Sequence, residues 1–238
     1  MEVLPTASMS DSQAQLSQQR YLIGSVLSPA VQLWLRSQAE RVERLEVKIG
    51  GRNREILNGY IPSIAIVAEG VVYRGLHLSK LYIQGENIRI NLDRILKGSP
   101  LQLIEPVSVN AKLHVSESDL NACLGSPWLE EVVGEFVQPK LPYSICLSTS
   151  RLELEIDRLV LRVSEPDPAI FNMGVTLPRH DRIELLDPIV KTTTIPAIST
   201  PLETIELDLG SDVFIEELNL EDRELFCRGS IVVQTDEG

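Results

Sequence analysis

The chain has 238 residues, of which 43% are hydrophobic and 24% are charged, a composition typical of soluble globular proteins. Its 22 basic and 34 acidic side chains give a formal net charge of −12, which argues against a general nucleic-acid binder because phosphate contacts need a basic face. Three widely spaced cysteines exclude a closed disulfide framework and a CxxC metal site, so we expect reduced thiols and a cytoplasmic compartment.

Residues 1–12 are small and polar, and we expect them to be disordered. The same stretch lacks the basic and apolar segments of a secretory signal. No apolar run approaches the roughly 20 residues that span a bilayer. The sequence therefore predicts a cytoplasmic protein without a signal peptide or a transmembrane segment, and it leaves peripheral attachment to a membrane open.

From about Ser12 to Val42 the apolar residues recur at spacings of three, four and seven, which is typical of a helix. Pro29, with Ser28 as a cap, predicts either two short helices or one long helix kinked at this point. After Val42 the apolar residues alternate up to Ile49, which predicts a strand closed by two glycines.

Most of the remaining chain has the two-residue alternation of β-strands. Gly85-Glu86-Asn87 lies between two alternating runs and predicts a hairpin turn. Each predicted strand has one apolar and one charged face, which is typical of an antiparallel sheet exposed to water on one side. The clearest alternating runs are 64–69, 81–84, 88–92, 151–156, 158–163 and 205–215.

A short helical segment interrupts the strands. Ser116 and Asp119 are spaced as in a capping box, and Ser126-Pro127 predicts the start of a second short helix. The expected fold is therefore α+β, with a large curved antiparallel sheet wrapped around the N-terminal helix and this central helix pair. No linker or composition break divides the chain, so we expect a single domain over residues 13–235.

The sequence contains no motif for a common catalytic or metal site. The three histidines are not spaced as zinc ligands, and there is no GxSxG, P-loop or GxGxxG motif. Carboxylate pairs such as Glu153 and Glu155 lie on one strand face, as expected for a solvated surface. We therefore expect neither an enzyme nor a metal or cofactor site.

The predicted apolar face is aliphatic and poor in aromatic residues, which suits acyl chains because these bind by burial and dispersion. Each buried CH₂ contributes about 0.8 kcal/mol, so part of one chain gives useful affinity. The same residues also suit a closed core, and both interpretations stay open. The candidate acyl-binding residues are Leu27, Val31, Ile64, Ile66, Leu81, Ile83, Ile88, Ile90, Leu152 and Leu154.

Arg52, Arg54 and Arg89 are candidates for headgroup contacts, because guanidinium groups match phosphate geometry. Interleaved glutamates mean that a solvated charged surface is the alternative. Residues 1–115 carry 13 basic and 10 acidic side chains, whereas residues 116–238 carry 9 and 24. The net charge is therefore +3 for residues 1–115 and −15 for residues 116–238. The first part can face an anionic partner such as lipid headgroups.

The stretch from Leu27 to Leu129 contains five short segments of a recognisable pattern: Leu45-Glu46-Val47, Leu57-Asn58-Gly59, Gly75-Leu76, Gly85-Glu86-Asn87-Ile88 and Ser118-Asp119-Leu120-Asn121. With these segments the stretch resembles the LmeA-like phospholipid-binding proteins, and in particular their cyanobacterial members. The resemblance implies a curved antiparallel sheet around a helix, similar to tubular lipid-binding domains, and non-catalytic binding of phospholipid in an apolar cavity. It also implies that the partner is phospholipid or a membrane surface, but it does not indicate which residues form the site. The alternative is a β-rich module with a closed core that docks a protein through a sheet edge or its acidic half.

Overall fold

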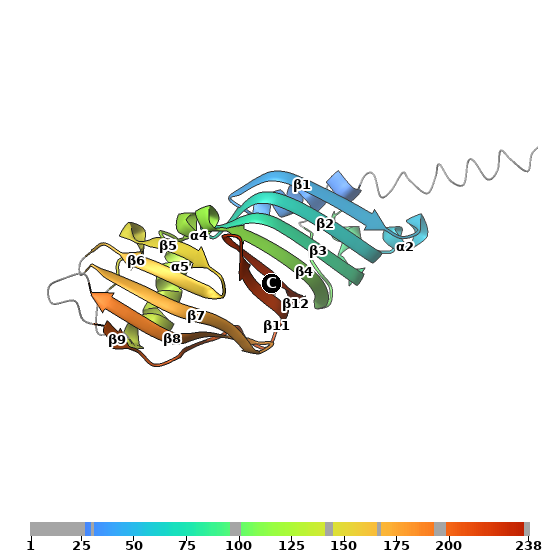
Figure 1. Cartoon of the computed structure of the whole chain (residues 1–238). Helices are drawn as coiled ribbons and strands as arrows, with labels where there is room; N and C mark the ends of the chain where they lie inside the picture. The colour runs from blue at the N-terminus through green and yellow to red at the C-terminus, as the bar shows by residue number, and fades with distance from the viewer. Residues whose placement is uncertain are drawn as a thin grey trace, which may run out of the picture.

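The computed structural model describes residues 27–29, 31–95, 101–140, 145–165, 168–192 and 199–235, most of them in two antiparallel sheets (Figure 1). The first sheet has the strand order β1-β2-β3-β4-β12-β11, so the last hairpin of the chain returns to pair with β4. Its strands are β1 (Arg41–Gly50), β2 (Tyr60–Tyr73), β3 (Leu76–Arg89), β4 (Val107–Ser116), β11 (Val213–Glu221) and β12 (Glu224–Val233).

The second sheet is formed by the middle of the chain and has the order β10-β8-β7-β6-β5, with β9 paired to β8. Its strands are β5 (Arg151–Glu155), β6 (Arg158–Val163), β7 (Ala169–Arg179), β8 (Arg182–Thr192), β9 (Ser199–Pro201) and β10 (Ile205–Asp208). The predicted α+β fold, with curved antiparallel sheet and few helices, is confirmed, and the strands divide into two sheets.

Helical segments lie at the ends of the sheets and on one face of each. The N-terminal helix, of which residues 27–29 and 31–38 are described, lies behind β1 in the view of Figure 1. The earlier part of the long predicted helix falls on residues outside the described part. Its predicted end at Val42 is wrong, because β1 already begins at Arg41. The other helices are α2 (Asn53–Leu57), α3 (Leu92–Ile95), α4 (Glu117–Cys123), α5 (Pro127–Val132), the π-helix η1 (Val133–Val137) and the 3₁₀-helices η2 (Gln138–Lys140) and η3 (Leu147–Thr149).

Each sheet has its own cluster of buried side chains. In the first cluster, Leu27 and Val31 of the N-terminal helix pack with residues of the first sheet such as Val47 and Val109. In the second cluster, α5 and η1 pack against the second sheet around Phe171. The amphipathic helices therefore cover the apolar faces of two sheets, as burial of alternating apolar residues requires.

The hairpin turn predicted at Gly85-Glu86-Asn87 is wrong, because β3 runs through these residues without a break. The turn lies at Arg74-Gly75, where both residues have positive φ angles of 50° and 74°. Asn87 also has a positive φ of 57°, but it lies opposite Pro62 in the register of β2 and β3. Proline has no N–H to donate to the ladder, so the left-handed residue fits inside the strand.

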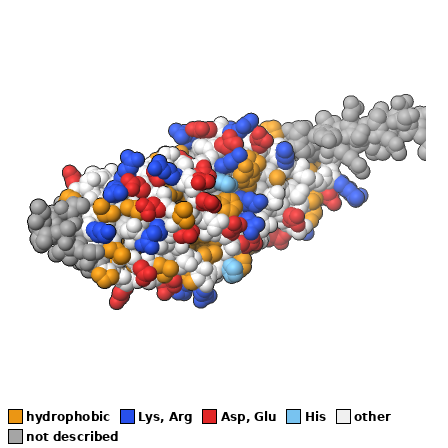
Figure 2. Space-filling model, in the orientation of Figure 1, with side chains coloured by type: hydrophobic (Ala, Val, Ile, Leu, Met, Phe, Trp, Pro, Cys, Tyr) orange, Lys and Arg blue, Asp and Glu red, His pale blue; other side chains and the backbone are white. Residues whose placement is uncertain are grey.

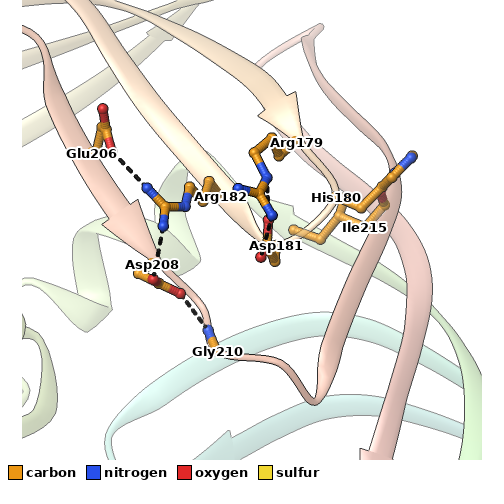
Figure 3. A network of polar contacts seen from close by, with 8 residues as sticks. All are labelled: Arg179, His180, Asp181, Arg182, Glu206, Asp208, Gly210 and Ile215. Atoms are coloured by element: carbon orange, nitrogen blue, oxygen red, sulfur yellow. Dashed lines mark hydrogen bonds and ion pairs between the residues drawn. The ribbon is translucent and has the colours of Figure 1, made fainter.

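The β7–β8 turn joins the two sheets, as Figure 3 shows. The carbonyl of His180 accepts a hydrogen bond from the Ile215 N–H of β11 at 2.7 Å, and the imidazole stacks on Phe214 at 4.0 Å. Arg182 binds Glu206 and Asp208 of β10 at 3.0 and 3.5 Å. These contacts hold the segment that carries the chain from β10 in the second sheet to β11 in the first.

Helix α4 forms the other connection between the sheets. The predicted cap is confirmed, since the Ser116 hydroxyl accepts a hydrogen bond from the Asp119 N–H at 3.2 Å. Burial favours the neutral form of Asp119, but hydrogen bonds from the Ser116 and Ser79 hydroxyls outweigh it and hold the pKa of this carboxyl below its usual value. On the opposite side, the Asn121 amide donates to the Leu152 carbonyl at 2.7 Å and accepts from its N–H at 2.9 Å, which ties α4 to β5.

Candidate functional site

The side of the first sheet that contacts the N-terminal helix is apolar across all six strands, and we call it the inner face. The strand register aligns it in three cross-strand rows that contain only apolar or glycine residues. From β1 to β11 the rows are Leu45, Ala68, Leu81, Leu113, Cys227 and Leu218; Val47, Ile66, Ile83, Ala111, Gly229 and Ile215; and Ile49, Ile64, Gly85, Val109, Ile231 and Val213.

The inner face is covered unevenly. On β1 to β3 it packs against the N-terminal helix in the first cluster. At Val107 and Val109 of β4 it is also buried in this cluster. It is more open at Ala111 of β4 and on β12, where Cys227 is half-buried and Ile231 and Val233 are each 40% exposed. Burial raises the pKa of the Cys227 thiol, as expected in apolar surroundings. An aliphatic surface that is left partly open can bind further apolar groups.

Eight of the ten predicted acyl-binding residues lie in or around the first sheet. Leu27, Val31, Ile88 and Ile90 are buried in the first cluster, Ile64, Ile66 and Ile83 pack against it, and Leu81 lies on the inner face. Leu152 and Leu154 lie instead on β5 of the second sheet, where Leu152 packs against the second cluster. The sequence reasoning missed the inner-face residues of β11 and β12, although these strands show the same alternation.

The three candidate headgroup arginines lie at the end of the first sheet that carries α2, on the right of Figure 1. Arg89 pairs with Glu105 at 3.2 Å and lies over the Tyr60 ring. The backbone N–H of Arg52 donates to Glu55 at 2.8 Å and so begins α2. Arg54 makes no ion pair or hydrogen bond with any residue that the structure describes.

A cavity of about 580 Å³ opens at the same end of the sheet, between α2, α3 and the segment before β4. Ile90, Leu92 and Leu103 line it and belong to or pack against the first cluster, so its floor is the apolar core. Leu57 and Ile104 also line the cavity, and they are 54% and 61% exposed. We call this region, formed by α2 with Arg52, by α3 and by residues 101–105, the α2–α3 end.

The opposite side of the first sheet, the outer face, is different in character. Figure 2 shows acidic and basic side chains interspersed over this side of the molecule, with small apolar areas between them. Tyr82, His114 and Phe226 form an aromatic group there, with ring centroids 6.4 and 4.9 Å apart. The alternation predicted from the sequence thus separates a charged outer face from an aliphatic inner face.

In the part of the chain that the structure describes, no three His, Cys, Asp or Glu side chains are grouped as metal ligands. The described helices are all too short or too polar to cross a membrane. The described cysteines, Cys123, Cys146 and Cys227, are free thiols.

Comparison with known proteins identifies the family. The model of the LmeA-like phospholipid-binding family matches residues 20–230, which include both sheets and the helices between them. Neither the curated proteins nor the solved structures compared with the chain gave a match. Because the family model spans most of the chain, this protein belongs to the LmeA-like phospholipid-binding family.

Proposed function

We propose that the protein holds phospholipid without changing it chemically, with the acyl chains on the inner face of the first sheet beside the N-terminal helix. The observation that carries this proposal is the continuous apolar inner face, which remains open at Ile231 and Val233. Membership of a phospholipid-binding family gives the ligand class.

The composition of the inner face favours acyl chains over aromatic ligands. All three rows are built from aliphatic side chains, alanine, glycine and one cysteine, and contain no aromatic ring. Ala111 is a small residue in the half-buried part of the inner face, where it leaves more room above the sheet than its larger row neighbour Ile83. Flexible methylene chains fill such a surface by dispersion contacts and by removal of apolar area from water.

The phosphate headgroup would lie toward the α2–α3 end. Arg54 is exposed there without an ionic partner among the described residues, and Arg52 is on the same helix. Arg89 is a weaker candidate, since Glu105 already neutralises it. The acyl chains would then run from this end along the sheet, away from bulk water.

Native mass spectrometry of gently purified protein, followed by lipid extraction, tests the proposal. We expect a bound phospholipid with intact ester bonds. Leu113→Asp places a charge on the half-buried inner face and should abolish lipid binding, because an unpaired carboxylate against acyl chains is costly. Lys112→Asp, on the outer face of the same strand, is the matched control and should retain the lipid.

A bare protein mass, together with no uptake of lipid from vesicles, would refute the proposal. Equal lipid binding by the two variants would remove the inner face as the site. Recovery of a stoichiometric protein partner in place of lipid would favour the alternative of an interaction module, for which β1, an edge strand of the first sheet, is a candidate docking strand.

A further inference from the structure

We propose that the α2–α3 end docks on the surface of an anionic phospholipid bilayer. The inference rests on the proposed function, because a protein that holds a phospholipid must exchange it with a membrane, and it names the surface that would make that contact.

Two large aliphatic side chains project at the α2–α3 end. Leu57 and Ile104 come from segments far apart in sequence, yet they line the same cavity and remain 54% and 61% exposed. Single exposed aliphatic residues are common on protein surfaces. Leu57 and Ile104, however, share the rim of one cavity, and the floor of this cavity is the apolar core. Together they form a surface that can contact the apolar interior of a bilayer.

The backbone beneath these residues is held in place by hydrogen bonds. The Ile104 N–H donates to the Arg89 carbonyl at 2.9 Å, and the Gln102 N–H donates to the Asn91 side chain at 2.8 Å. On the other side of the cavity, the Ile90 N–H donates to the Gly59 carbonyl at 2.9 Å. The exposed aliphatic residues are therefore presented by an ordered edge of the sheet.

The charges of the α2–α3 end suit an anionic surface. It carries Arg52, Arg54 and Arg94 against Glu55 and Asp93, and its Glu105 pairs with Arg89 of β3. Together with Arg89 the end therefore has a formal charge of +1. Glu55 is also occupied, since it accepts the hydrogen bond that begins α2. The chain as a whole carries −12, so an anionic bilayer would repel most of the molecule and orient this end toward the membrane.

Vesicle flotation with the full chain tests the inference. We expect the protein to co-float with vesicles that contain phosphatidylglycerol, less with phosphatidylcholine alone, and less again at high salt. Ile104→Glu should lower the bound fraction about tenfold, because it removes an aliphatic contact with the bilayer and adds a negative charge. Ile156→Glu is the matched control: Ile156 is 78% exposed in the β5–β6 turn of the second sheet. It should leave binding within about twofold of the unmodified chain.

Equal flotation of the two variants, or no binding to anionic vesicles, would overturn the inference. The lipid content of the same samples separates this result from failure of the proposed function. Bound phospholipid without flotation would refute docking and retain the proposed function. Flotation that depends on Ile104 in a protein without bound lipid would retain docking and refute the proposed function.

Discussion

Replacing Ala111 with tryptophan should close the inner face to acyl chains without unfolding the sheet. Ala111 is half-buried on β4, between Ile83 of β3 and Gly229 of β12. Six strands about 4.8 Å apart and three rows about 6.8 Å apart make the face roughly 24 by 14 Å, and its open half about 170 Å². At about 25 cal/mol per Å², that half contributes about 4 kcal/mol to acyl binding. A tryptophan side chain covers about 150–250 Å², so most of this energy should be lost.

The expected result is a dissociation constant for a fluorescent phospholipid that rises about 1,000-fold, measured by titration. Asn110→Trp adds the same ring to the exposed outer face of the neighbouring position and should bind as the unmodified chain does. Because the new ring lies on open aliphatic surface, the thermal midpoint of Ala111→Trp should change by no more than about 4 °C. If Ala111→Trp folds and binds lipid as tightly as Asn110→Trp, acyl chains do not occupy the inner face.

Three further experiments test the same structure. Bound phospholipid should slow the labelling of Cys227 by maleimide, measured by peptide mass spectrometry, although burial already raises the pKa of this thiol. Equal labelling rates with and without lipid would argue against the inner face as the site. Burial would raise the pKa of Asp119, but two serine hydroxyls hold it below its ordinary 3.8. The Asp119 carboxylate therefore stabilises the fold fully at a pH above 3.8, and this stabilisation is lost as the pH falls through the lower pKa of the folded state. Asp119→Asn should thus cost about 1–2 kcal/mol in urea unfolding at neutral pH and little in strong acid; a pH-independent cost would contradict this origin. Gly229→Ala should destabilise by about 2–3 kcal/mol, because its Cβ would lie 2.1 Å from a backbone carbonyl oxygen of β11. Gly134→Ala meets nothing within 4 Å and should cost nothing, so equal unfolding midpoints of the two alanine variants would refute the steric argument.

Local signals in the sequence were sufficient for the class of fold and for several element boundaries. The cap at Ser116 and the helix start at Ser126-Pro127 were predicted because a side chain there bonds a backbone N–H three residues on. Strand alternation likewise reports which side chains share a face, since successive residues point to opposite sides. These signals predict the α+β fold, and the family resemblance predicts lipid binding.

The composition of the candidate site depended on contacts between distant parts of the chain. Alternation does not say which strands pair, so it could not show that Leu152 belongs to the second sheet or that Cys227 lies beside Leu113 on the inner face. The turn-like sequence around Asn87 was also misleading. Asn87 adopts a left-handed conformation opposite Pro62, so β3 continues where the sequence predicts a turn. Pairing is decided by which apolar faces can be buried together, and this energy exists only once strands more than a hundred residues apart have met.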